Sequence, residues 1–244
     1  MNPHKLTLQL SLCLLIALFS TAEGIAQRRP PTGGRLAVVV DERLAALRST
    51  PDLSGRLVRR LGRGRVVAIR GSRTVADGVV FLLVNVTTRT HGWIQREAVV
   101  SAARAGDDQR LLDLIKASEV FDRIVRARIF LDNFTRSPLR PQVLLLFSDA
   151  AEEQAARLSR DASQRLKVER LNRTGSTAPE FSYFLNYTGL DRYNRQRVGF
   201  TFDRTTKHFH YDGAALRELL RRYPNSPEAI AAHKRLVQLT QLKN

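Results

Sequence analysis

Two patterns of apolar positions divide the chain after an apolar N-terminal stretch. Between residues 35 and 101, short apolar runs alternate with turn-forming residues, a pattern typical of β-strands. After residue 107, apolar residues recur every three to four positions, which is typical of amphipathic helices. The patterns predict an α+β protein: a small β-barrel over residues 35–101, followed by a mainly α-helical domain over residues 107–244.

The first part contains five or six candidate strands. They cover residues 36–40, 56–58, 66–69, 79–86, 92–94 and 99–100. Asp77-Gly78 is a strong signal for a hairpin turn that opens the fourth of these runs. So many short strands within about 65 residues are typical of a small barrel. Residues 101–106 are mostly small, and we expect them to link the barrel to the helices as a short, flexible segment.

The helical part begins at Asp107-Asp108, where either carboxylate can accept hydrogen bonds from the free N–H groups of the first turn. Apolar residues then keep helical spacing from Leu111 to Ile129. Ser118 and Glu119 either separate two helices or form an exposed turn on one helix.

One eight-residue pattern occurs twice in the helical part. Leu131-x-x-Phe134-x-x-Ser137-Pro138 aligns with Leu220-x-x-Tyr223-x-x-Ser226-Pro227. Each copy predicts a helix that ends at an aromatic residue and a second helix that begins after Ser-Pro, since Pro fits the first helical turn. The copies are 89 positions apart, too far for one repeat unit. They are either two similar helical hairpins with an insertion between them or two independent corners.

The insertion contains a predicted β-hairpin near residues 198–211, formed by residues 199–202 and 207–211. Alternation places His208 and His210 on one face of the second strand. That spacing is compatible with zinc, but no third ligand has a recognisable spacing beyond Asp212. We therefore expect polar residues of a half-buried hairpin there, with no metal and no cofactor.

The N-terminus has the features of a secretory signal peptide. Lys5 precedes an apolar run over residues 12–19, and small-x-small sites end at Ala22 and Ala26. We expect cleavage after one of them, so that residues 1–26 form the signal and residues 27–34 a Pro- and Gly-rich linker. The alternative is an uncleaved anchor, but polar residues interrupt the stretch early. The mature protein is then periplasmic or extracellular, with no further transmembrane span.

The formal net charge of the chain is +17. Residues 35–101 contain twelve Arg and Lys against five Asp and Glu, and residues 102–244 contain 25 against 17, so the net charges are +7 and +8. Such an excess favours polyanions. Export makes an anionic envelope polymer the expected partner rather than nucleic acid, although an ordinary basic surface gives the same composition. Cys13 is the only cysteine and lies in the signal, which excludes disulfides and thiol nucleophiles from the mature chain.

Several motifs in the first part resemble bacterial Src homology 3 (SH3-like) domains. They are Leu47-Arg48-x-x-Pro51, Ser54-Gly55, Leu61-x-x-Gly64-x-x-Val67 and His91-Gly92-Trp93-Ile94. The resemblance implies a module that binds cell-wall peptides or packs against a companion domain. It makes Phe81 and Trp93 candidate ligand-binding residues, although the family's second aromatic near Phe81 is replaced by aliphatic residues. Trp93 either stacks on a ligand or fills the interior of the barrel.

The two corners resemble the helix–turn–helix joints of tetratricopeptide repeats, which implies helix pairs with a protein-binding surface. The chain contains no serine elbow, no His-Glu-x-x-His motif and no phosphate-binding glycine loop. No catalytic residues are assigned. The sequence thus favours a non-catalytic envelope protein that binds a cell-wall peptide or an envelope protein. The alternatives are a basic binder of anionic polymer and a cell-wall hydrolase or metal-dependent envelope enzyme.

Overall fold

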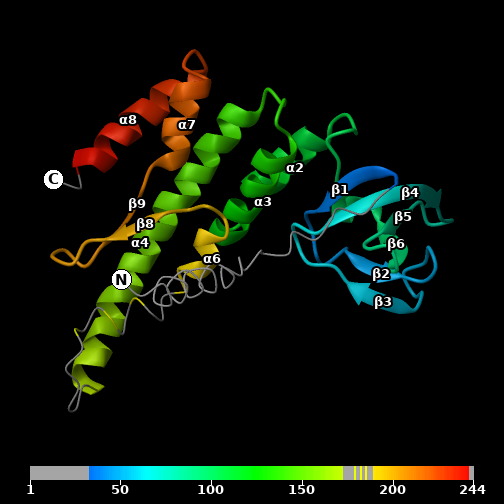
Figure 1. The fold of residues 1–244 in the computed structure, drawn as a ribbon, viewed down its shortest axis with the longest axis horizontal. Helices are drawn as coiled ribbons and strands as arrows, with labels where there is room; N and C mark the ends of the chain where they lie inside the picture. Colours follow the sequence, from blue (N-terminus) through cyan, green and yellow to red (C-terminus); the bar gives the residue numbers. More distant parts are fainter. Residues whose placement is uncertain (1–32, 173–178, 180–181, 183–184, 186–188, 242–244) are drawn as a thin grey trace, which may run out of the picture. The chain divides into compact units, whose positions relative to one another are not determined.

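The computed structural model describes residues 33–172, 179, 182, 185 and 189–241. The expected signal peptide and nearly all of the linker lie outside these residues. Residues 31–244 form one compact unit. Its described residues contain a seven-stranded antiparallel sheet, a separate two-stranded hairpin and six α-helices (Figure 1). The sequence prediction of a protein with an N-terminal β part and a helical C-terminal part is confirmed at this level.

The strands of the large sheet are β1 (Arg35–Val39), β2 (Ala46–Arg48), β3 (Leu57–Arg60), β4 (Val66–Thr74), β5 (Val80–Asn85), β6 (His91–Gln95) and β7 (Val99–Val100). Six strands of the large sheet overlap the predicted apolar runs, and β2 was not predicted. The Asp77-Gly78 turn joins β4 to β5 as predicted. Gly78 takes a φ of 82°, and Asp77 Oδ1 accepts a hydrogen bond from the Val79 N–H at 3.1 Å.

The sheet does not close into a barrel, and in this respect the sequence prediction was wrong. The strand order is β3-β2-β6-β5-β4-β1-β7, and β3 and β7 do not pair with each other. β7 is only two residues long and pairs with β1 alone. The chain then turns away at Ser101, whose side chain donates to the Leu36 carbonyl at 2.6 Å. The last strand therefore ends without pairing with β3, and β3 remains an exposed edge.

One face of the sheet carries its own apolar core. Leu47 of β2, Ile94 of β6 and Leu82 and Val84 of β5 are all buried there, together with residues of β1, β4 and β7. Alternation along the strands turns the intervening residues to the opposite face.

The described helices are α2 (Asp107–Lys116), α3 (Val120–Asn133), α4 (Arg140–Asn172), α6 (Asp191–Asn194), α7 (Ala214–Arg222) and α8 (Pro227–Gln241). Ser118 and Glu119 do separate two helices. Gly106 is the N-cap of α2 in the left-handed conformation, and, as predicted for one of the two aspartates, Asp108 Oδ1 accepts from a first-turn N–H, that of Gln109, at 2.9 Å. None of the described helices has the length and apolar character needed to cross a bilayer.

The two corners predicted from the repeated pattern share their backbone geometry. In each, the aromatic residue caps the first helix: the Phe134 N–H bonds to the Phe130 carbonyl and the Tyr223 N–H to the Leu219 carbonyl, both at 2.8 Å. The serines differ, because Ser137 Oγ accepts from the Leu139 N–H at 3.2 Å, whereas Ser226 Oγ is buried without a partner among the described residues.

A buried arginine joins the two corners. Arg140 is 4% exposed, and its guanidinium donates to the Leu131 carbonyl at 2.7 Å and to the Tyr223 hydroxyl at 3.0 Å. It also lies 3.6 Å from Glu218 Oε1. Arg140 thus bridges the two copies of the pattern, which are distant in sequence.

The predicted hairpin forms from β8 (Phe200–Phe202) and β9 (Phe209–Tyr211). Ser159 of α4 holds β9 in place, since its hydroxyl accepts from the Phe209 N–H at 2.8 Å and bonds to the Ala155 carbonyl at 2.8 Å. In Figure 1 the hairpin runs beside α4.

The sheet and the helices share one apolar cluster. Val38, Val40 and Val100 of the sheet region are buried with residues of α2, α3 and α4. Buried polar groups reinforce the contact: Arg126 donates to the Val40 carbonyl at 3.2 Å, and Asp107 accepts from the Ser101 N–H at 2.7 Å. Residues 101–106, which we expected to link the sheet to the helices, are therefore held to both parts by hydrogen bonds at Ser101.

Candidate functional site

A cross-strand row runs over the face of the sheet that points away from its core. Pairing register aligns Leu57 of β3, Arg48 of β2, Trp93 of β6, Leu83 of β5 and Gly71 of β4. Side chains of directly paired residues lie on the same face of a sheet, within about 5 Å at the Cβ atoms. We call these five residues the Trp93 row.

Trp93 does not fill the interior. It is half-buried and belongs to neither apolar cluster, while its neighbours Gly92 and Ile94 are buried on the core face. Phe81 lies on the same face as Trp93 by register, but it is only 1% exposed. Phe81 therefore offers no surface to a ligand, and of the two predicted ligand-binding residues only Trp93 is accessible.

Gly92 fixes the position of Trp93 relative to β2. A Cβ atom at Gly92 would lie 2.6 Å from the Arg48 carbonyl oxygen and 3.0 Å from Leu47 Cγ. Only glycine therefore permits this close approach of β6 to β2. The same approach pairs Trp93 with Arg48, whose guanidinium donates to the Gly55 carbonyl at 2.6 Å.

The two ends of the row differ. One end carries the apolar side chain of Leu57 and the cationic side chain of Arg48, and the other ends at Gly71, which has no side chain. Leu57 is 44% exposed, while no atom lies within 4 Å of a Cβ built on Gly71. A register shift between Ile69 and Gly71 accompanies this bare stretch of β4. The row can thus hold a flat or extended group against the indole, with Arg48 beside it for a negatively charged atom.

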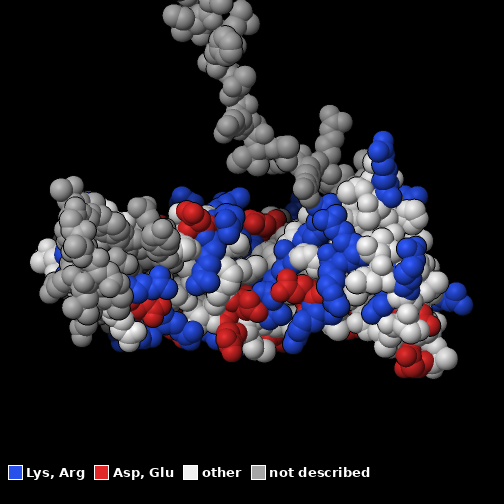
Figure 2. All heavy atoms as spheres, turned by 90° about the horizontal axis from the view of Figure 1, so that it is seen from below, with Lys and Arg blue, Asp and Glu red and all other residues white. Residues whose placement is uncertain are grey.

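Exposed arginines without ion pairs surround this face. No carboxylate among the described residues pairs with Arg56, Arg59 or Arg60 next to or on β3, or with Arg73 on β4. Figure 2 shows the result: the sheet region is mainly blue and white, whereas blue and red side chains lie side by side over the helices.

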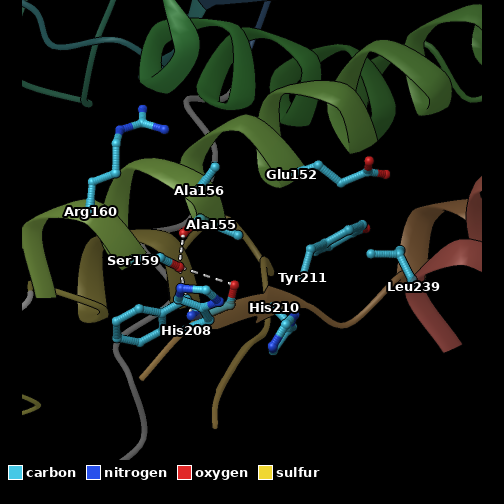
Figure 3. A pocket seen from close by; sticks show the side chains of 10 residues that line it. Glu152, Ala155, Ala156, Ser159, Arg160, His208, His210, Tyr211 and Leu239 are labelled. Carbon is cyan, nitrogen blue, oxygen red and sulfur yellow. Dashed lines mark hydrogen bonds between the residues drawn. The ribbon is translucent and has the colours of Figure 1, made fainter. Parts of the chain in front are cut away.

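A second candidate site is a pocket of about 420 Å³ in the helical part (Figure 3). Glu152, Ala155, Ala156, Ser159 and Arg160 of α4 line one side, residues 208–211 line the other, and Leu239 of α8 adds to the wall. Glu152 Oε1 is buried without a hydrogen-bond partner among the described residues. Burial raises the pKa of Glu152 above its ordinary value.

The histidine pair lines this pocket, but its surroundings are not those of a metal site. His208 is exposed and His210 half-buried, and Asp212 Oδ1 already accepts from the Ala214 N–H at 2.9 Å. Within the described part of the chain, no three His, Cys, Asp or Glu side chains are placed to hold a metal ion.

Sequence reasoning missed several residues of both sites. It assigned no role to Glu152, although Glu152 lies three and seven positions before the buried Ala155 and Ser159 and so shares their side of α4. It assigned no binding role to Arg48, Leu57, Leu83 or Gly71, because a row across strands appears only once the strand order is known. Comparisons with protein-family models, with curated proteins and with solved structures found no match.

Proposed function

We propose that the protein is an exported, non-catalytic binding protein of the bacterial cell envelope, whose sheet is an SH3-like module that holds its ligand on the Trp93 row. The accessible indole of Trp93, aligned with Arg48 and Leu57, is the observation that carries this proposal. A large aromatic ring that is only half-buried, next to a cation, is typical of a binding surface.

The chemistry of the row fits a cell-wall peptide. Such a peptide offers carboxylates for Arg48 and small apolar side chains for Leu57 and the indole of Trp93. The bare backbone at Gly71 leaves room for the peptide to continue over β4. The proposed ligand is therefore extended and carries negative charge.

We propose that the helical part is a tetratricopeptide-like scaffold that presents a surface for an envelope protein. The support is the shared geometry of the two corners and their contact through Arg140. Helix pairs of this type pack side by side and leave one surface for a partner.

Fluorescence tests the proposed ligand site directly, because Trp93 is the only tryptophan of the chain. Titration with soluble peptidoglycan fragments is expected to shift or quench its emission. Arg48→Gln should weaken binding about tenfold, which corresponds to about 1.4 kcal/mol. The matched control is Arg89→Gln, since Arg89 is exposed, has no ion pair among the described residues and lies outside the row.

Two results would count against this site. One is binding of the fragments, measured by calorimetry, without any change in Trp93 emission. The other is an equal loss of affinity in the Arg48 and Arg89 variants, which would show that net charge alone matters.

A second function, binding of an anionic envelope polymer through the basic surface, is supported by the unpaired arginines around β3. Electrostatic attraction of this kind weakens with salt, because the Debye length falls from about 10 Å at 0.1 M to 3 Å at 1 M. Retention on immobilised wall polymer that decreases steadily with salt favours this function. Retention that is independent of salt favours the Trp93 row.

A further inference from the structure

We propose that the pocket between α4, β9 and α8 binds a primary amine carried on an apolar stem, with the ammonium group at Glu152. This site is separate from the Trp93 row and does not depend on the function proposed for it. Figure 3 shows Glu152, Tyr211 and Leu239 together at one end of the pocket, and Arg160 at the other end. Its volume of about 420 Å³ is within the range of small-ligand sites.

Two polar side chains of the pocket wall, those of Ser159 and Tyr211, already have partners within the protein. The Ser159 hydroxyl bonds to the backbone of Phe209 and Ala155. The Tyr211 hydroxyl accepts from the Ala215 N–H at 2.9 Å. Beside the pocket, Asp149 pairs with Arg235 and thereby ties α8 to α4. Glu152 Oε1 is buried with neither a hydrogen-bond donor nor an ion-pair partner among the described residues.

Glu152 is half-buried, but its Oε1 atom is buried without a donor, which is costly for an ionised carboxylate, and a positively charged ligand removes that cost. An ammonium group supplies both the charge and the N–H donors that Glu152 lacks. A neutral donor would supply only the hydrogen bond. The surroundings of Glu152 therefore select a cation.

The rest of the wall suits an apolar stem. The side chains of Ala155 and Ala156 are small and leave space between α4 and β9. Leu239 and the ring of Tyr211 add apolar surface. An unbranched chain can lie along the alanines while its charged end reaches Glu152. The same chemistry occurs in a free alkylamine and in a lysine side chain of a peptide.

Calorimetry with matched probes tests this site in the mature protein. The probes are hexylamine, hexan-1-ol and hexanoate, which share the stem and differ in the end group. We expect hexylamine to bind at least about tenfold more tightly than hexan-1-ol, and hexanoate to bind least. Nα-acetyl-lysine methylamide distinguishes the two sources: binding as tight as hexylamine indicates a lysine side chain, and much weaker binding indicates a free amine.

Variants locate the probe. Glu152→Gln should remove the preference for the amine over the alcohol, while the control Glu153→Gln should keep it, because Glu153 is exposed and pairs with Arg157 at 2.9 Å. Ala156→Phe, at an exposed position of the wall, should block all three probes and serves if the Glu152 variant fails to fold. Histidine ring signals in NMR spectra should shift for His208 or His210 when hexylamine binds.

The proposal is overturned by equal binding of hexylamine and hexan-1-ol, by a preference for hexanoate, or by hexylamine binding that survives Ala156→Phe. A preference for hexanoate would place the selective group at Arg160. None of these outcomes depends on Trp93 fluorescence, so this site and the Trp93 row succeed or fail separately.

Discussion

The sheet and the helices have nearly equal net charge but use their arginines in different ways. In the helical part, most arginines bond to carboxylates or to backbone carbonyls. The helical arginines with a carboxylate partner are Arg104, Arg110, Arg123, Arg128, Arg140, Arg157, Arg197, Arg222 and Arg235. Around the sheet, the exposed Arg43 and Arg96 pair with Asp41 and Glu97, whereas seven other exposed arginines have no ion pair among the described residues. The seven are Arg35, Arg56, Arg59, Arg60, Arg70, Arg73 and Arg89.

This difference shows that net charge alone does not identify a binding surface. A charge that is already paired contributes to the fold and attracts ligands weakly. An unpaired exposed charge contributes little to the fold and attracts oppositely charged ligands more strongly. The helical part has 17 acidic residues to pair with its cations, and the region of residues 35–101 has five. The expected binding surface is therefore the sheet, and the expected structural role of arginine lies in the helices.

The largest predicted effect tests whether the sheet and the helices unfold separately or together. Phe130 of α3 is fully buried and stacks on Phe134, with 5.1 Å between the ring centroids. Phe130→Ala should lower the free energy of unfolding by about 3–5 kcal/mol. Because Val38, Val40 and Val100 belong to the same cluster, the sheet should be destabilised with the helices.

Two probes in one urea titration measure this coupling. Trp93 fluorescence follows the sheet, and far-ultraviolet circular dichroism follows the helices. Both transitions should move together to lower urea in Phe130→Ala. A fluorescence transition that stays in place would show that the sheet folds independently.

A smaller effect on stability is expected from Arg140, a buried arginine of the helical part. Arg140→Leu removes the donor for the Leu131 carbonyl and the contact with the Tyr223 hydroxyl, in a buried setting. Loss of these hydrogen bonds should cost about 3 kcal/mol in chemical denaturation. Arg136→Gln is the control in the same corner, since Arg136 is exposed and unpaired among the described residues, and it should be neutral. Equal stability of the two variants would contradict a structural role for Arg140.

Much of the secondary structure could be predicted because its signals are local. Turn residues such as Asp77-Gly78 fix the ends of strands, and Ser-Pro after an aromatic residue marks each helical corner. The hairpin β8–β9 was predicted from the two short runs of residues 199–202 and 207–211. In each case a few neighbouring residues determine the backbone conformation.

The open sheet and the Trp93 row could not be predicted because both depend on contacts between distant residues. Whether β7 reaches β3 depends on where Ser101 is held, and its partners Leu36 and Asp107 lie 65 and 6 positions away. Alternation along β6 places Trp93 and Ile94 on opposite faces of the sheet. Only the buried residues packed around Ile94 show which of the two faces is the core. The place of Glu152 in a pocket could not be predicted either, because it depends on the position of the hairpin, whose strand β9 lies over the same side of α4.

The pH dependence of stability provides a third test, within the helical region. Burial raises the pKa of Glu152 above its ordinary value of 4.5, so the folded state binds this proton more tightly than the unfolded state. Stability should therefore fall as the pH rises from 4.5 through the raised pKa. Glu152→Gln should melt at a higher temperature than the unsubstituted protein at pH 7, and the difference should vanish below pH 4.5. Glu153→Gln should show no such gain, and an equal gain would point to net charge instead.

The smallest effect on stability, and the most direct test of the comparison, is expected at the edge of the sheet. Changing Arg56, Arg59 and Arg60 together to Gln should alter the free energy of unfolding by less than about 0.5 kcal/mol, because none of them has an ion pair among the described residues and all are exposed. The same change should weaken retention on an anionic wall polymer and reduce its dependence on salt.

The matched control removes the same charge from the helices. Arg136, Arg195 and Arg221 are also exposed and without ion pairs among the described residues, but they belong to the part of the chain that has 17 acidic residues rather than five. If unpaired charge concentrated on the sheet forms the binding surface, their change to Gln should lower retention less than the change at β3. Equal losses would mean that the polymer responds to total charge, and the distinction between the two regions would then hold for the fold but not for binding.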